Sequence, residues 1–78
     1  MAQKIKLYST PACVYCKMAR QYFIERGIPF EETDVSSSHA AAQEMMKKSG
    51  QMGVPVIEID GQIVVGFDRA KIKELLAG

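Results

Sequence analysis

The sequence predicts an α/β domain whose elements follow in the order β-α-β-α-β-β-α. Three observations predict this order. Strand-like apolar runs alternate with two segments of helical spacing, an Asp-Gly pair separates the last two strand-like runs, and a third helical segment follows them. With 78 residues and no linker, repeat or low-complexity tract, the chain has room for one domain, expected to span residues 1–78.

The first half of the chain predicts a βαβ unit. Residues 5–8 alternate apolar and polar side chains, and turn-forming residues follow them. The apolar spacing is then helical over residues 14–26, and Gly27 can end that helix in the left-handed conformation. Residues 28–35 are typical of a second strand. Because a helix of about three turns separates the two strands, they are expected to be parallel.

A second helix is predicted over residues 39–49, since apolar side chains recur there at helical spacing. The polar turn at residues 36–38 can cap its start, and Gly50 can end it. Residues 51–53 are expected to form the loop that leads to the next strand.

The last part of the chain predicts a hairpin and a helix. The strand-like runs 54–59 and 62–66 flank Asp60-Gly61, a strong short-range signal for a tight type I′ turn. Asp68 can then cap a final helix. The side chains expected to face the core from that helix are Ile72, Leu75 and Leu76.

Composition excludes several classes of function. The chain has 10 Lys and Arg against 9 Asp and Glu, and its longest basic block is Lys47-Lys48, so the basic patch of a nucleic-acid-binding protein is missing. No signal-peptide pattern opens the sequence, and no segment approaches the ~18 apolar residues of a membrane span. We therefore expect a cytoplasmic monomer, in a reducing compartment where two nearby cysteines are reactive or metal-binding.

The pair Cys13 and Cys16 forms a CxxC motif where the first helix should begin. Unpaired backbone N–H groups and the helix dipole at that end favour a thiolate on Cys13, which can then attack a disulfide. Cys16, one turn inside the helix and more shielded, can attack the resulting mixed disulfide and release the reduced substrate.

Three other interpretations of the cysteines are open. A zinc site would need four ligands, and only His39 remains as a further Cys or His. A structural disulfide would close a very small loop and stabilise little. Two inert core thiols are the third interpretation. A CxxC that opens a helix directly after a strand in a βαβ unit favours redox chemistry.

The Val54-Pro55 pair is the second candidate element of the site. A proline cannot donate to a sheet ladder, so Pro55 belongs at the start of its strand or on an edge. A cis bond before Pro55 would expose the backbone N–H and C=O of Val54 to an extended substrate. An ordinary trans bond is the alternative, since only ~5% of X–Pro bonds are cis.

Taken in order, residues 8–16 (YSTPACVYC), 53–55 (GVP) and 66–68 (GFD) closely resemble the glutaredoxins, and the match covers essentially the whole chain. The resemblance implies a thioredoxin-like fold, in which three helices flank a four-stranded mixed sheet. It also implies a cis bond before Pro55.

The resemblance assigns roles residue by residue. Cys13 matches the family's nucleophile, Cys16 its resolving thiol, and Val54 the residue whose backbone pairs with the cysteine moiety of glutathione. The further candidates for binding glutathione or a peptide are Tyr15, Gln51, Pro55, Phe67 and Asp68. Asp68 could instead be a plain helix cap, Gln51 a solvated loop residue, and Tyr15 an exposed aromatic.

Two departures point to a related group. Val14 replaces the usual proline between the cysteines, and Gly66-Phe67 replaces a Gly-Gly pair. Both features resemble the glutaredoxin-like redoxins that donate electrons to ribonucleotide reductase and are recharged by thioredoxin reductase. The Trp-Ser pair that usually precedes that glycine is Val64-Val65 here, so the sequence combines the two patterns.

The sequence therefore predicts a thiol–disulfide oxidoreductase that reduces protein disulfides or glutathione mixed disulfides by a dithiol mechanism. Its expected partners are disulfide-containing proteins, together with glutathione or a thioredoxin-reductase-type flavoenzyme as reductant. No tightly bound cofactor or metal is expected, and NADPH would belong to the reductase, since no dinucleotide-binding glycine pattern occurs. The alternatives are an iron–sulfur carrier that shares a cluster through Cys13 and two glutathiones, and a binding module with inert thiols.

Overall fold

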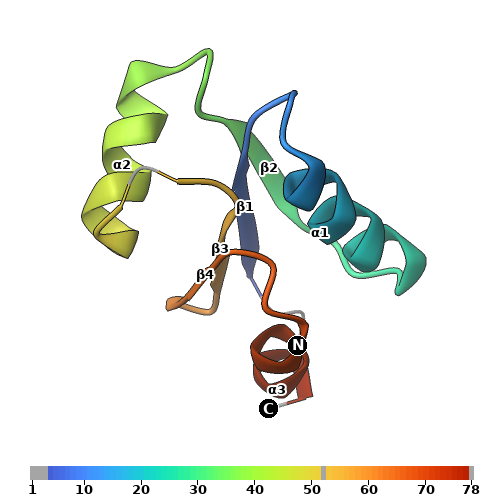
Figure 1. The fold of residues 1–78 in the computed structure, drawn as a ribbon. Coiled ribbons are helices and arrows are strands. Elements are labelled where there is room, and N and C mark those ends of the chain that lie inside the picture. The colour runs from blue at the N-terminus through green and yellow to red at the C-terminus, as the bar shows by residue number, and fades with distance from the viewer. Residues whose placement is uncertain (1–3, 52, 78) are drawn as a thin grey trace.

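The computed structural model describes residues 4–51 and 53–77, which form seven elements in the predicted order (Figure 1). These are β1 (Ile5–Ser9), α1 (Val14–Glu25), β2 (Glu31–Asp34), α2 (His39–Ser49), β3 (Val56–Ile59), β4 (Gln62–Val65) and α3 (Arg69–Ala77). Met52, in the middle of the predicted loop 51–53, lies outside the described residues.

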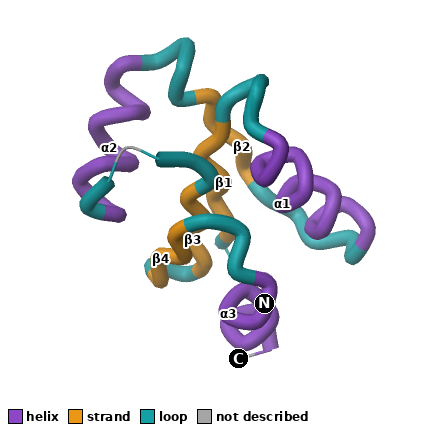
Figure 2. The backbone as a smooth tube through the Cα atoms, viewed as in Figure 1, coloured by secondary structure: helices purple, strands orange, loops and turns teal. Residues whose placement is uncertain are grey.

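The four strands form one mixed sheet in the order β2-β1-β3-β4. β1 pairs with β2 in parallel, whereas β3 is antiparallel to both β1 and β4. Helices α1 and α3 cover one face of this sheet and α2 covers the other (Figures 1 and 2). The parallel βαβ unit, the hairpin and the mixed sheet flanked by three helices are all confirmed.

The apolar side chains of the strands divide between the two faces because successive residues point to opposite sides. On β1, Ile5 and Leu7 are buried under α1 and α3, while Tyr8 is buried under α2. The larger buried cluster consists of Ile5, Leu7, Ala19, Tyr22, Phe23, Ile57, Ile59, Val64 and Ile72. The smaller one consists of Tyr8, Met45 and Val56.

Two strands are shorter than the sequence indicates. The ladder of β2 begins at Glu31 instead of residue 28, because the N–H of Ile28 donates to the carbonyl of Phe23 at 2.9 Å and closes the end of α1. The ladder of β3 begins at Val56, which pairs with Tyr8. Pro55, which has no N–H to donate, lies just before it.

Local turn signals predict the remaining boundaries well. Gly50 ends α2 at φ 75°, and its N–H donates to the carbonyl of Met46 at 2.8 Å. Asp60 and Gly61 both have positive φ, 49° and 86°, which is the requirement of the predicted type I′ hairpin. The hairpin thus fixes the register of β3 against β4, in which Ile59 faces Gln62.

Candidate active site

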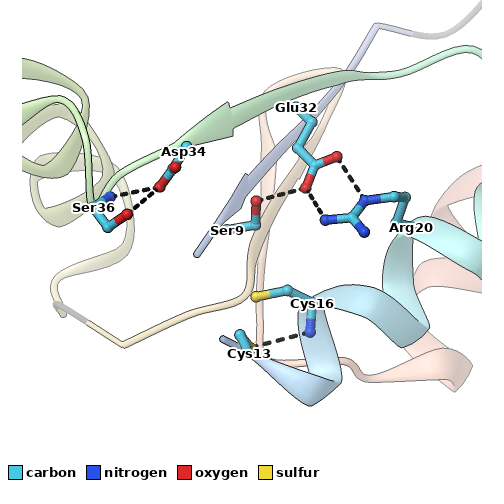
Figure 3. Close-up of polar contacts among 7 residues, drawn as sticks. All are labelled: Ser9, Cys13, Cys16, Arg20, Glu32, Asp34 and Ser36. Atoms are coloured by element: carbon cyan, nitrogen blue, oxygen red, sulfur yellow. Dashed lines mark hydrogen bonds and ion pairs between the residues drawn. The ribbon is translucent and has the colours of Figure 1, made fainter. Parts of the chain in front are cut away.

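Cys13 is the N-cap residue of α1, as predicted. Its backbone is extended, with φ −86° and ψ 116°, and its Sγ accepts a hydrogen bond from the N–H of Cys16 at 3.1 Å (Figure 3). The Cys13 side chain is therefore held against the helix N-terminus, where N–H donors and the helix dipole favour negative charge. Cys13 is half-buried and Cys16 is completely buried, and neither is in a disulfide.

Burial has a large effect on Cys16. The pKa of its thiol is raised to about 12, mainly because burial removes it from solvent, and the hydrogen bond with Cys13, the charge of Cys13 and the charge of Glu32 act in the same direction. A backbone hydrogen bond with Thr10 acts in the opposite direction and lowers this pKa. Cys16 is thus held as a neutral thiol next to a half-buried Cys13, so the two cysteines have different environments although only two residues separate them.

A charged cluster lies on the sheet side of α1 beside Cys16 (Figure 3). The guanidinium of Arg20 donates twice to the carboxylate of Glu32, from Nε to Oε1 at 2.7 Å and from Nη2 to Oε2 at 2.5 Å. The buried hydroxyl of Ser9 donates to the same Oε2 at 2.7 Å. Arg20 lowers the pKa of Glu32, and Ser9 lowers it further. The carboxylate is therefore ionised and firmly oriented near the buried thiol of Cys16.

This Arg20–Glu32–Ser9 cluster is the part of the site that sequence reasoning misses. Glu32 has the appearance of a solvated surface acid in the sequence. Its position depends on the register of β2, which pairs Glu32 with Leu7 and so directs its side chain to the α1 face. One local signal exists: Arg20 follows Cys16 by four residues, and residues at this spacing share a helix face.

The bond between Val54 and Pro55 is cis, as the family resemblance implies. Val56 at the start of β3 pairs with Tyr8 near the end of β1. Val54 and Pro55 therefore lie beside the residues that follow β1, at the same end of the sheet as Cys13. Within residues 4–51 and 53–77, the backbone N–H and C=O of Val54 have no hydrogen-bond partner. They are available to pair with an extended substrate.

The structure gives Tyr15 and Gln51 different surroundings. Tyr15 is 61% exposed on the first turn of α1, where it can form the rim of the site. Gln51 is held within its own loop, since its Nε2 donates to the carbonyl of Gly53 at 3.4 Å and its N–H donates to the hydroxyl of Ser49 at 3.3 Å. A ligand carboxylate would have to compete with the first of these bonds.

Phe67 and Asp68 lead into α3. The ring of Phe67 packs edge-on against Tyr22, with 5.9 Å between centroids, so its side chain contributes to the core and its backbone remains the part suited to a ligand. Asp68 caps α3: its Oδ1 accepts from the N–H of Lys71 at 3.2 Å, and its carbonyl accepts from Ile72. The predicted cap is confirmed, and the other carboxylate oxygen, which accepts no hydrogen bond within the described residues, is the one most open to a ligand amino group.

Two further searches concern the described residues only. Within 4–51 and 53–77, no group of three or more His, Cys, Asp and Glu side chains is arranged to hold a metal ion. Among the same residues, no helix is both long and apolar enough to cross a membrane.

Comparisons with known proteins place this dithiol site in a family context. The family model described as Glutaredoxin matches residues 5–64. A glutaredoxin-like 8.6 kDa protein of a rubredoxin operon in Clostridium pasteurianum is 44% identical, over 92% of this chain and 96% of its own length. Glutaredoxin 3 of Escherichia coli is 34% identical, over 82% of this chain and 77% of its own.

A solved structure extends the comparison to the redoxin group. The glutaredoxin-like NrdH-redoxin of Escherichia coli, described as having a thioredoxin-like activity profile, superposes with a TM-score of 0.82 and 26% identity. The match covers 92% of this chain and 93% of that one. The fold and the paired cysteines define a redox protein of the thioredoxin-like superfamily. Within that class, the chain belongs to the glutaredoxin family.

Proposed function

We propose that this glutaredoxin-like protein is a thiol–disulfide oxidoreductase that reduces protein disulfides or glutathione mixed disulfides through Cys13 and Cys16. The observation that carries the proposal is the asymmetry of the pair. Cys13 is partly accessible, and its Sγ accepts the N–H of Cys16 at 3.1 Å at the start of α1, whereas Cys16 is completely buried. One sulfur is suited to attack an external disulfide and the other to a later, internal attack.

The reaction would proceed in two exchanges. The Cys13 thiolate attacks one sulfur of the substrate disulfide, a Cys13–substrate disulfide forms, and the other sulfur leaves as a thiolate that takes a proton from water. Cys16 then loses its proton and attacks Sγ of Cys13, which releases the second substrate thiolate. The two electrons that reduce the substrate come from the dithiol, which ends as a Cys13–Cys16 disulfide.

The surroundings of Cys16 support this order of events. Two of the causes that raise its pKa are the hydrogen bond and the charge of Cys13. Both are lost once Cys13 is bound in a mixed disulfide, so the pKa of Cys16 falls at the stage when it must act. Desolvation persists and keeps Cys16 from competing with Cys13 for the incoming substrate.

The unpaired backbone of Val54 gives the substrate a second point of attachment. A cysteine held in an extended peptide, or the cysteine moiety of glutathione, can form two backbone hydrogen bonds there and present its sulfur to Cys13. Tyr15 and the backbone around Phe67 would complete the rim. Glutathione is the first candidate for the reductant that returns the Cys13–Cys16 disulfide to the dithiol.

A flavoenzyme of the thioredoxin reductase type is the second candidate for that reductant. The likeness to NrdH-redoxin favours it, together with Val14 and the Gly66-Phe67 pair. Recycling of the oxidised protein separates the two candidates: glutathione with its reductase is compared with thioredoxin reductase, with NADPH in both assays. The faster recycling identifies the reductant.

Single-cysteine variants test the mechanism. We expect Cys13→Ser to abolish disulfide reduction, because no other thiol is accessible within the described residues. Cys16→Ser should still undergo the first exchange and should accumulate a mixed disulfide on Cys13, which intact-protein mass spectrometry detects as an adduct. If Cys13→Ser retains full activity with a protein disulfide, the proposed roles are wrong.

A further inference from the structure

Helices α1 and α3 lie on the same side of the sheet (Figure 1), and residues of both helices line an open groove. Two shallow hollows, of about 280 Å³ and about 290 Å³, share Tyr22, Arg26 and Arg69 and so form one continuous surface. Met18 and Phe67 lie at one end of it and Lys73 at the other. We refer to this surface as the α1–α3 groove.

The groove carries positive charge that the protein itself does not neutralise. Within the described residues, Arg26, Arg69 and Lys73 form no ion pair, although Arg20 and Lys48 elsewhere are both paired. The guanidinium of Arg26 lies over the ring of Tyr22, 4.0 Å from its centroid, which fixes one of these charges on the groove floor. An acidic ligand would find cations there with their hydrogen-bond donors unused.

The groove wall includes one carboxylate. Glu25 lies on α1, and its Oε1 already accepts a hydrogen bond from Nε2 of Gln21 at 3.2 Å. Three cations against one acid leave the surface clearly positive, while the whole chain has a net charge of only +1. The positive charge is therefore concentrated in the groove.

The end of the groove formed by Met18 and Phe67 leads to the candidate active site. Val14 and Met18 are 67% and 45% exposed, and their four-residue spacing places them on one line along α1 from Cys13 toward Tyr22. A polypeptide bound along this line would pass from the reactive sulfur over an apolar stretch and then reach the cations.

The rise of α1 sets the distance from Cys13 to the cations of the groove. Tyr22 and Arg26 follow Cys13 by nine and thirteen residues, which corresponds to ~13 Å and ~20 Å along a helix that rises ~1.5 Å per residue. An extended peptide covers ~3.3–3.6 Å per residue. Acidic side chains would thus meet the cations roughly four to six residues from the target cysteine.

We propose that the α1–α3 groove docks an acidic segment of the protein substrate, located four to six residues from the cysteine that Cys13 attacks. The inference rests on the proposed function, because it names the kind of substrate that the same site selects. Charge at such a surface acts mainly on the rate of encounter and on its salt dependence, so docking should appear in kcat/KM.

The test uses synthetic peptides that each carry one cysteine in a mixed disulfide with thionitrobenzoate. One peptide has three Glu residues at positions four to six from the cysteine, one has them at positions ten to twelve, and one has Gln at all of these positions. Stopped-flow absorbance measures thionitrobenzoate release by the reduced protein. We expect the first peptide to react fastest, with a rate advantage that disappears at high salt.

Charge reversal then locates the effect. In Arg69→Glu/Lys73→Glu, the rate constant for the first peptide should fall roughly tenfold, while that for the Gln peptide should stay within about twofold. Lys71→Glu, an exposed change on the same helix outside the groove, is the matched control and should alter neither rate. Equal rates for the three peptides with the unaltered protein, or an equal loss for all of them in the double variant, would overturn the proposal.

A binding measurement separates this proposal from the proposed function. Fluorescence anisotropy with Cys13→Ser and the same peptides, without the thionitrobenzoate group, reports docking alone. Tighter binding of the first peptide, lost in Arg69→Glu/Lys73→Glu, supports the groove even if disulfide reduction fails. Indistinguishable binding of all three peptides refutes docking even if reduction is fast.

Discussion

The two faces of the sheet are covered in different ways. On one face, α1 and α3 pack with the sheet around a cluster of nine buried residues. Three rings, Tyr22, Phe23 and Phe30, pack in sequence there, with centroids 5.4–5.8 Å apart. On the other face, α2 contributes Met45 to a cluster that has three buried members among the described residues. Cys13 and Cys16 lie at the start of α1, so both cysteines are carried by a helix that contributes to the larger cluster.

Charged side chains complete the α2 face. Nζ of Lys48 lies 2.8 Å from Glu58 on β3 and 3.5 Å from Glu44 on α2. Lys6 also pairs with Glu44, and both lysines lie over the ring of Tyr8, at 5.5 Å and 5.9 Å from its centroid. The α1–α3 face thus holds the larger apolar cluster, whereas the α2 face combines a smaller core with a charged margin.

Truncation of each core should give the largest effects. Phe23→Ala removes a ring from the nine-residue cluster and should destabilise the protein by about 3–5 kcal/mol, a large share of the ~4–12 kcal/mol expected for 78 residues. Met45→Ala should cost less, nearer ~2 kcal/mol, because α2 can settle onto a smaller cluster. Urea unfolding measures both. A greater loss for Met45→Ala would reverse our ranking of the two faces.

Helix caps give an intermediate effect on both faces. Asp68→Ala and Ser38→Ala each remove the side-chain oxygen that accepts a helix N–H, from Lys71 and Ala41 respectively, and each should cost about 0.5–2 kcal/mol. If Asp68 also binds glutathione, Asp68→Asn should keep the stability but slow recycling by glutathione. Ser38→Ala is the control, and glutathione should recycle it at the same rate as the unaltered protein. If glutathione recycles all three variants at the same rate, Asp68 acts only as a helix cap.

Much of the fold follows from signals that are local in sequence. Gly50 ends α2, Asp60-Gly61 turns the hairpin, and Cys13 stands at the start of α1, and each of these outcomes depends on a few adjacent residues. The ends of strands depend less on adjacent residues. The N–H of Ile28, for example, donates to the carbonyl of Phe23 at the end of α1 and not to a neighbouring strand. The predicted strand 28–35 was therefore too long at its start.

The charged parts of the site depend on packing between distant segments. Glu32 meets Arg20 only because β1 and β2 pair with Leu7 opposite Glu32. Arg26 and Arg69 face one groove only because α1 and α3 cover the same side of the sheet. No periodicity or spacing in the sequence encodes these distances, so the motif predicts where the two sulfurs lie but not the charges around them.

The ion pairs should give the smallest effects on stability, with opposite pH dependence on the two faces. Glu32→Gln and Lys48→Gln should each cost about 0.2–1 kcal/mol at neutral pH, since these side chains are partly exposed. Folding lowers the pKa of Glu32, so its contribution exists above the unfolded pKa, near 4.5, and is lost as the pH falls. Folding raises the pKa of Lys48, so its contribution exists below about 10.5 and is lost as the pH rises.

Urea unfolding across the pH range separates the two pairs. Compared with the unaltered protein, Glu32→Gln should show a weaker loss of stability in acid and Lys48→Gln a weaker loss in alkali. A chemical measurement sharpens the comparison, because Glu32 is among the groups that raise the pKa of Cys16, whereas Lys48 lies on α2 at the other face of the sheet (Figure 1). In a Cys13→Ser background, Glu32→Gln should speed alkylation of Cys16 in mildly alkaline buffer, whereas Lys48→Gln should leave that rate unchanged. Equal alkylation rates in the two variants would mean that Glu32 supports the fold without acting on the thiol of Cys16.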